Sequence, residues 1–260
     1  MCARIFTKKE LELREMAKDL KEKHGCIALK MGTEVEDCSF EYIDWVSKLM
    51  EGILPIVVKI GGPEARNDIR QLTDRIGVQG LIAPMVETPY GLKKFVSALR
   101  DIVPPDRRGE MIKGINAETV TCYRNFDAIL SIPEAEELNQ VTIGRDDLSE
   151  SIGKKVDDPE VMSMAREITR KAQAKGILVS VGGGITPSNA KRILSEIKPD
   201  KINSRHVVIG VDRSPDISES FRKALAFESA LIELEVLSLN QRINSLNRRT
   251  ETLKKRMAAV

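Results

Sequence analysis

The 260-residue sequence has few of the residues that mark several common classes of protein. Its four cysteines, Cys2, Cys26, Cys38 and Cys122, show no CxxC spacing, so we expect reduced thiols. Acidic and basic residues nearly balance, at a net charge of +2. This balance argues against a dedicated nucleic-acid binder, because such domains carry a strong basic excess.

Long apolar segments are also missing. No apolar run approaches the roughly 20 residues that a helix needs to span a bilayer, so we expect no membrane segment. The N-terminal sequence becomes charged after Phe6 and lacks the apolar region of a secretory signal. We therefore expect a cytoplasmic protein.

Apolar runs of strand length alternate with longer segments of helical period along most of the chain. Because the strands are almost continuously apolar, the pattern predicts a parallel sheet that is buried on both faces. The predicted strands begin at Cys26, Leu54, Gly80, Met111, Gln140, Ile177 and His206. The predicted helices between them are Ser39–Met50, Pro63–Ile76, Pro89–Ile102, Thr119–Ser131, Pro159–Lys175 and Pro187–Glu196.

Eight such units would close a TIM-type (β/α)8 barrel, and the length of the chain suits that fold. We predict the missing first strand in the stretch "ARIF" near the N-terminus, followed by a helix over Lys8–Lys23. An open doubly wound sheet is the alternative, although no early GxGxxG follows a strand. The barrel is expected to occupy residues 1–215.

Residues 216–260 have a different pattern. From Ser218 to Met257 there is no proline or glycine, and apolar residues recur in heptads. This pattern predicts a long coiled-coil helix through which the chain forms a homo-oligomer. A terminal helix packed only on its own barrel is the alternative. The positions at seven-residue intervals are Leu225, Ile232, Leu239, Leu246 and Leu253, with Val236, Ile243, Thr250 and Met257 four residues after the last four.

Polar and charged side chains follow nearly every predicted strand. The C-terminal ends of barrel strands form the active site in this fold, so we expect these side chains to meet in one carboxylate-rich cavity. In strand order they are Lys30 with Glu34 and Glu36, then Lys59, Glu87, Asn116 with Glu118, Arg145 with Asp146 and Asp147, Gly183 within "GGG", and Arg205.

Glu118 and Asp147 follow consecutive predicted strands. Neighbouring strands lie about 4.8 Å apart, and two carboxylates held so close raise each other's pKa unless a cation lies between them. Oxygen ligands without a histidine or cysteine cluster favour Mg²⁺ or Mn²⁺. The alternative is a salt bridge from Arg145 to one of the aspartates, or a helix cap.

The stretch "SVGGGITPSN" places three glycines between a predicted strand and a predicted helix. Backbone N–H groups in such a turn can bind a phosphate or carboxylate, and Arg205 can supply a matching charge. A tight turn that needs positive φ is the alternative interpretation.

Three stretches, "GLIAPMVETPYGLKKF", "INAETVTCYRNFDAILSIPEA" and "VTIGRDDLSESIG", resemble the aldolase/citrate lyase family of the phosphoenolpyruvate/pyruvate barrel superfamily. In that family the glutamate of "ET" and the aspartate of "DLS" bind a divalent metal, and they correspond here to Glu118 and Asp147. A polar residue also precedes the glutamate, as Asn116 does here. Asp146 is expected to point elsewhere or to cap the following helix.

The resemblance implies a carbon–carbon lyase or aldolase that binds an oxo acid, as a free acid or an acyl-CoA, on the metal. Two departures stand out. Lys59 replaces the arginine that usually contacts the substrate, and the Asp/His pair that transfers protons in the aldolase branch is missing. We expect Lys59 and Arg145 to face the developing negative charge, and Glu36 or Glu34 to act as the general base. We expect the substrate to be bound by Lys30, Glu34, Glu87, Asn116, Gly183 and Arg205.

Three further interpretations stay open at this stage. Lys59 could form a Schiff base with the substrate. The glycine-rich turn could make the chain a barrel enzyme for a phosphorylated intermediate. The departures from the family pattern could instead indicate a non-catalytic scaffold that recruits a partner through its coiled coil.

Overall fold

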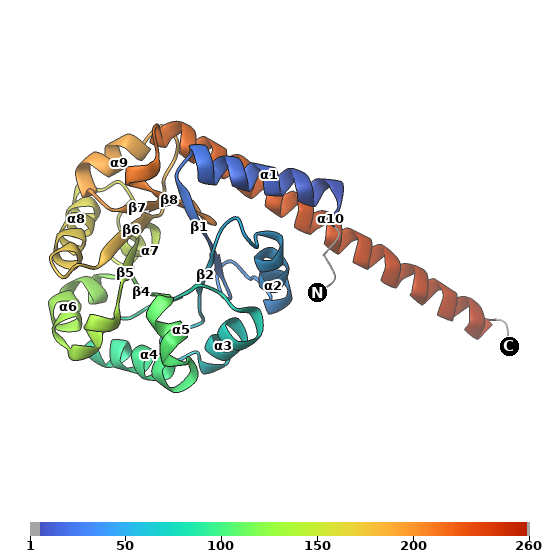
Figure 1. The fold of residues 1–260 in the computed structure, drawn as a ribbon, viewed down its shortest axis with the longest axis horizontal. Coiled ribbons are helices and arrows are strands. Elements are labelled where there is room, and N and C mark those ends of the chain that lie inside the picture. The colour runs from blue at the N-terminus through green and yellow to red at the C-terminus, as the bar shows by residue number, and fades with distance from the viewer. Residues whose placement is uncertain (1–5, 259–260) are drawn as a thin grey trace.

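The computed structural model describes residues 6–258, and its eight strands close into one barrel in chain order (Figure 1). The predicted α/β barrel is therefore confirmed, and the open sheet is not. The strands are β1 (Cys26–Gly32), β2 (Ile56–Lys59), β3 (Gly80–Ala83), β4 (Ile112–Ala117), β5 (Gln140–Gly144), β6 (Leu178–Gly182), β7 (Lys201–Asn203) and β8 (Val207–Gly210).

The first barrel strand is Cys26–Gly32, not the stretch "ARIF". That stretch lies outside the described residues except for Phe6, which belongs to no strand. The strand that the sequence pattern did not reveal is β7, because its three residues are too few to stand out as an apolar run. Lys59 consequently ends the second strand, and Glu118 and Asp147 follow the fourth and fifth.

Strand β8 runs antiparallel to both of its neighbours, β7 and β1, whereas β1 to β7 pair in parallel. Only residues 204–206 connect β7 to β8, and a parallel connection needs a crossover of a dozen or more residues. The expectation of a wholly parallel sheet is thus wrong at this strand. As a result, the 204–206 turn lies at the same end of the barrel as the C-terminal ends of β1 to β7.

The helices surround the barrel (Figure 1), and every predicted helix is present, Lys8–Lys23 and Pro89–Ile102 with the predicted bounds and the others with shifted ends. Thr88, Thr119 and Asp158 cap their helices through side-chain oxygens, as Ser/Thr/Asp N-caps commonly do. The short helices α5 and α7 were not predicted. The helices are α1 (Lys8–Lys23), α2 (Phe40–Leu49), α3 (Arg66–Arg70) continued by a π-helix (Gln71–Ile76), α4 (Pro89–Ile102), α5 (Pro105–Glu110), α6 (Val120–Ser131), α7 (Arg145–Glu150), α8 (Pro159–Gln173), α9 (Ala190–Ile197) and α10 (Ile217–Ala258), with 3-10 turns at Pro133–Glu137 and Val211–Arg213.

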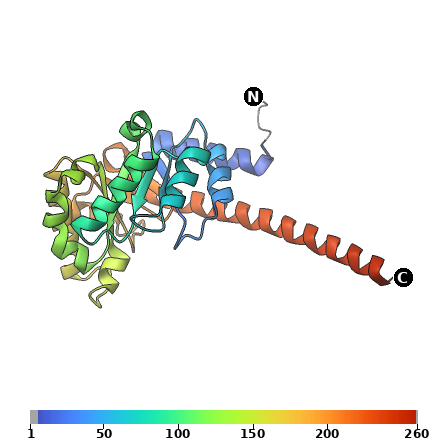
Figure 2. The same cartoon turned by 90° about the horizontal axis from the view of Figure 1, so that it is seen from below.

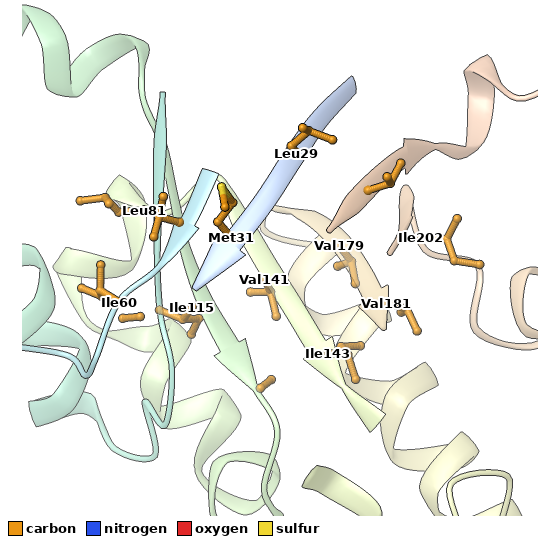
Figure 3. Packing of buried hydrophobic residues seen from close by; sticks show 14 of the residues in the cluster. Leu29, Met31, Ile60, Leu81, Ile115, Val141, Ile143, Val179, Val181 and Ile202 are labelled. Atoms are coloured by element: carbon orange, nitrogen blue, oxygen red, sulfur yellow. The ribbon is translucent and has the colours of Figure 1, made fainter. Parts of the chain in front are cut away.

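The main hydrophobic core lies between the barrel and its helices. Side chains such as Leu29, Met31 and Val179 point outward from the strands (Figure 3). Because side chains alternate along a strand, the residues between them face the barrel interior. Ala28 and Val57 therefore belong to a separate interior cluster with Ile82 and Val208. The same alternation turns the strand-end residues inward.

Helix α10 has 42 residues and two different environments. Its first turns bury Phe221, Phe227 and Leu231 and pack against α1, α9 and β8. Beyond about Leu234 the helix projects away from the barrel, as both views show (Figures 1 and 2). Packing on its own barrel therefore explains only the first part of this helix. Within residues 6–258, no helix combines the length and apolar character needed to cross a bilayer.

Candidate active site

A cavity of about 370 Å³ opens at the C-terminal ends of β1, β2 and β4 to β7. Besides Asp146, eight of the residues singled out from the sequence line it, contributed by six strand ends or the loops that follow them. This clustering is what the strand-end argument predicted. These residues are Lys30, Glu36, Lys59, Asn116, Glu118, Asp147, Gly183 and Arg205.

The two expected metal ligands approach the same point. A Cβ atom placed on Gly144 would lie 3.2 Å from Oε2 of Glu118 and 3.7 Å from Oδ2 of Asp147. Glycine at the end of β5 thus leaves open the space between the two carboxylates. Glu118 is buried, whereas Asp147 lies on the exposed first turn of α7.

Two hydrogen bonds fix the Glu118 carboxylate. The Asn116 amide donates to Oε2 at 2.8 Å, and the backbone N–H of Met85 donates to Oε1 at 3.0 Å. Met85 has a φ of 54°, which is unusual for a residue with a side chain, and this conformation accompanies its contact with Glu118. Asn116, expected to bind substrate, therefore lines the cavity and orients the neighbouring carboxylate.

The electrostatics of the cavity favour a cation beside Glu118. Burial raises the pKa of Glu118, and the nearby Asp147 adds to this effect. A divalent ion between the two carboxylates would reverse both influences. Five acidic and three basic side chains line the cavity, an excess of two negative charges among the described residues. The acidic ones are Glu36, Glu118, Asp146, Asp147 and Glu228, and the basic ones are Lys30, Lys59 and Arg205.

Within residues 6–258, no cluster of three or more His, Cys, Asp and Glu side chains is arranged to hold a metal. The Glu118–Asp147 pair can supply at most two protein ligands. Such a pair suits Mg²⁺, which usually keeps several waters and takes one or two carboxylates from the protein. The donor set and the charge of the cavity therefore fit the predicted ion.

Lys59 and Glu36 form a buried ion pair in the same cavity. Nζ of Lys59 lies 3.4 Å from Oε2 of Glu36. Burial alone would raise the pKa of Glu36, but the ammonium groups of Lys59 and Lys30 outweigh it and hold the pKa below the ordinary value. Glu36 is thus ionised near neutral pH. Burial lowers the pKa of Lys30, and the nearby positive charge of Lys59 lowers it further.

The turn between β7 and β8 carries Arg205 to the rim of the cavity. Glu228 of α10 holds this turn in place. Its Oε1 accepts hydrogen bonds from the Ser204 hydroxyl at 2.6 Å and from the Val207 N–H at 3.1 Å. The N–H of His206 donates to the same oxygen. Helix α10 thereby completes one wall of the cavity, to which Phe221 and Leu225 also contribute.

Three predicted site residues are not in the cavity. Arg145, expected to face the reacting centre, is fully buried, and its guanidinium donates to the Gly183 carbonyl and, at 3.2 Å, to Asp157. Glu87 accepts a 2.6 Å hydrogen bond from Thr119. Glu34 is exposed beside Gly61. The structure gives none of these three contact with the cavity, so we do not retain their expected roles.

The salt bridge proposed as an alternative within "RDD" is also absent, because the ion-pair partner of Arg145 is Asp157. Asp146, expected to point elsewhere, lines the cavity. The three residues open helix α7, where consecutive side chains are turned by about 100°. Strand alternation therefore fails at this point, and Arg145 is the residue that turns away.

The turn Gly182–Gly184 lines the cavity beside Asp146. Gly183 has a φ of 88°, and a Cβ there would lie 2.6 Å from the Asp146 backbone nitrogen. The turn therefore requires glycine for its conformation and for close packing, as the tight-turn interpretation stated. Its place in the cavity wall also keeps anion binding open.

Sequence reasoning missed several residues that line the cavity. Thr142 and Asn203 face inward at the ends of β5 and β7, and strand alternation applied to every strand would have found Thr142. Glu228 had no such signal, because it lies 21 residues after Val207 on a helix that we assigned to oligomerisation.

Comparisons with known proteins identify the family of the chain. Residues 56–193 match the family model described as HpcH/HpaI aldolase/citrate lyase. The match covers more than half of the chain, from β2 into α9, and includes Lys59, Asn116, Glu118 and Asp147. No curated protein matches the chain.

Solved structures share the fold at low sequence identity. An HpcH/HpaI aldolase from Desulfitobacterium hafniense DCB-2 is 17% identical, with a TM-score of 0.59 over 74% of this chain and 80% of that chain. An aldolase/citrate lyase family protein from Burkholderia cenocepacia J2315 is 15% identical, with a TM-score of 0.59 over 85% and 99%. The citrate synthase SbnG is 18% identical, with a TM-score of 0.58 over 73% and 80%. The protein belongs to the HpcH/HpaI aldolase/citrate lyase family, whose name describes carbon–carbon lyase activity.

Proposed function

We propose that the chain is a carbon–carbon lyase that depends on Mg²⁺ or Mn²⁺ and acts on a 2-oxo acid or a related carboxylate. The observation that carries the proposal is the convergence of Glu118 and Asp147 on the open space above Gly144, inside a cavity with an excess of negative charge. Those two carboxylates would hold the ion. When bound, it would polarise a substrate carbonyl and offset the negative charge that develops there.

The basic side chains of the cavity would bind the substrate carboxylate. Lys59 and Lys30 lie at the ends of β2 and β1, and Arg205 lies at the rim. An ammonium group attracts an anion as a point charge and lacks the planar fork of a guanidinium. Two lysines thus replace, in this proposal, the single arginine that the family pattern places at Lys59.

Glu36 is the residue that we assign to proton transfer. It is ionised, buried and held by Lys59, so it can accept the proton of a substrate hydroxyl as the adjacent carbon–carbon bond breaks. The electron pair of that bond then passes to the oxo acid as an enolate, and the other fragment leaves as an aldehyde or ketone. The enolate carbon then takes a proton back from the Glu36 carboxyl group or from water to give the released oxo acid. Glu34, the other candidate base, lies outside the cavity.

Metal-stripped protein can be incubated with 4-hydroxy-2-oxo acids, with and without Mn²⁺, while pyruvate release is followed. We expect turnover only with the metal, and a loss of at least about 100-fold in Glu118→Gln and Asp147→Asn. Glu150→Gln is the matched control, because Glu150 is an exposed carboxylate of α7 outside the cavity. Full turnover in chelator, or a borohydride-trapped lysine adduct, would contradict the metal-dependent reaction.

A second candidate is an enzyme for a phosphorylated intermediate. It is favoured by one observation, the presence of the Gly182–Gly184 turn and Arg205 in the same cavity. If inorganic phosphate stabilises the protein against denaturation, and this stabilisation is lost in Arg205→Gln, the result would support this candidate. Unchanged stability with phosphate would exclude it. The scaffold interpretation predicts neither metal binding nor turnover.

A further inference from the structure

The projecting part of α10 carries an apolar seam that nothing within residues 6–258 covers. Its side chains are exposed by 47% at Ile232, 52% at Ile243 and 77% at Met257. Singly exposed apolar residues are common, but a continuous apolar row marks an interaction surface. We define the seam as Ile232, Val236, Leu239, Ile243, Leu246, Thr250, Leu253 and Met257.

We propose that the seam is covered by the same seam of a second copy of this chain, running antiparallel in a two-stranded coiled coil. The heptad spacing fits a helix as the partner, because only a second helix presents knobs at the matching interval. The seam spans 26 residues, about 38 Å from Ile232 to Met257 at 1.5 Å per residue. A helix of this length that left its apolar face in water would gain no packing energy to keep it folded.

The seam is complementary to itself in the antiparallel direction. The seam has two sets of residues at seven-residue intervals, one beginning at Ile232 and one at Val236. In the antiparallel arrangement each residue of one set lies opposite a residue of the other set in the second copy. One register uses the whole seam and fills every layer. Its layers pair Ile232 with Met257, Val236 with Leu253, Leu239 with Thr250, and Ile243 with Leu246 of the second copy.

The distribution of charge along α10 selects the antiparallel direction. Residues 226–241 contain three glutamates and no basic residue. Residues 242–258 contain six basic residues and one glutamate. Because Glu228 is buried against the 204–206 turn and Glu235 bonds to Tyr42, Glu233 is the acidic side chain that can take part in pairing. A parallel pair would place the two basic halves side by side, whereas an antiparallel pair places the basic half beside Glu233.

The flanking positions agree with this direction. In the antiparallel register Glu233 lies beside Lys254 of the second copy, and the symmetry repeats the contact. In a parallel pair Arg249 would face Lys254 of the second copy, and no flanking pair would be oppositely charged. The antiparallel register has one like-charged pair, Arg242 with Arg249. Glu235 is half-buried and bonds to Tyr42 of α2, so we assign it no part in the pairing.

The direction can be tested by disulfide formation in the full chain, in a Cys2→Ser background that retains the buried Cys26, Cys38 and Cys122. Val236→Cys and Leu253→Cys chains are co-expressed with different tags and then oxidised. The antiparallel dimer predicts a covalent dimer that contains both tags and none in which Leu253→Cys is linked to itself, because those two sites lie about 25 Å apart. Self-linked Leu253→Cys would overturn the antiparallel direction.

The second measurement is the mass of the protein in solution. Light scattering of the natural chain is expected to give a dimer, and Ile243→Asp/Leu246→Asp is expected to weaken self-association by at least about 100-fold. Binding of Mn²⁺ should be unchanged in this variant, since the seam is distant from Glu118 and Asp147. A natural chain that stays monomeric at micromolar concentration would overturn the proposal and would leave the proposed function untouched.

Discussion

An oxygen of Glu118 and an oxygen of Asp147 lie 3.2 and 3.7 Å from the position that a Cβ on Gly144 would occupy. The side chain that is missing from Gly144 thus leaves the space in which the two carboxylates can share a cation. The strand that carries Gly144 and the strand that precedes Glu118 are neighbours in the barrel, so this relationship follows from strand order.

Gly144→Ala tests that relationship without changing any charge. The added methyl would lie 3.1 Å from Cβ of Glu118 and would occupy the space between the carboxylates. We expect Mn²⁺ affinity to fall by about 10-fold to 100-fold, as it does when groups that orient metal ligands are disturbed. Titration calorimetry with Mn²⁺ checks this value. Gly153→Ala is the control. A Cβ on Gly153 would have no atom within 4 Å, and its φ of 66° means that this variant reports the effect of backbone strain alone.

Lys59→Met should destabilise the fold, because it leaves the buried Glu36 carboxylate without its nearest cation. Removing one partner of a buried ion pair costs about 3 kcal/mol of unfolding free energy. We expect Lys59→Met/Glu36→Gln to recover part of that loss, with a coupling of about 1–3 kcal/mol. Urea unfolding of the four proteins measures it. Additive single effects would show that the pair does not interact.

The same pair predicts a pH dependence. Lys59 and Lys30 hold the pKa of Glu36 below its ordinary value, so its stabilising effect is present above an ordinary glutamate pKa of about 4.3. The effect is lost as the pH falls through the lowered pKa. The stability difference between the natural chain and Lys59→Met should therefore shrink in acid. A difference that stayed constant or grew below about pH 4 would contradict the assignment.

Arg145 should behave as a structural residue. Its buried guanidinium joins the Gly183 carbonyl to Asp157, and it does not line the cavity. Arg145→Met is expected to lower the unfolding free energy by about 1–3 kcal/mol, because it removes the hydrogen bonds of the guanidinium to the half-buried Gly183 carbonyl and to Asp157. Below its melting temperature the variant should still bind Mn²⁺ within about threefold of the natural chain. Loss of Mn²⁺ binding in a folded Arg145→Met protein would show that Arg145 contributes to the metal site, contrary to this assignment.

The buried thiols should resist alkylation in the native protein. Burial raises the pKa of Cys26 and Cys122 to about 12 and that of Cys38 to about 11, so little thiolate forms near pH 8. Mass spectrometry after iodoacetamide treatment should find these three residues unmodified in buffer and modified in urea. Rapid modification of any of them in native protein would contradict its burial.

The sequence predicts much of the fold because apolar strands alternate with amphipathic helices over most of the chain. It also predicts that Lys30, Lys59, Glu118 and Asp147 meet, because each follows a strand and strand ends converge in a barrel. Predicting that these four residues meet required no knowledge of side-chain contacts. The resemblance to a family then suggested which pair holds a metal.

Other parts of the site depend on contacts that no local pattern records. The antiparallel β8 arises from the short 204–206 turn, and that turn is held by Glu228 from a distant helix. Arg145 could not be separated from Asp146 by spacing, because the chain changes there from strand to helix and the side-chain period changes with it. Tertiary packing decided the first outcome, and the local change from strand to helix decided the second.

The most direct test of the metal site is a crystal structure of the protein soaked with Mn²⁺ and oxalate, a mimic of an oxo acid. We predict anomalous density for one Mn²⁺ between Glu118 and Asp147, with oxalate on the ion and within reach of Lys59. A fully occupied Mn²⁺ elsewhere, or oxalate bound to the lysines with no ion beside those carboxylates, would contradict the account.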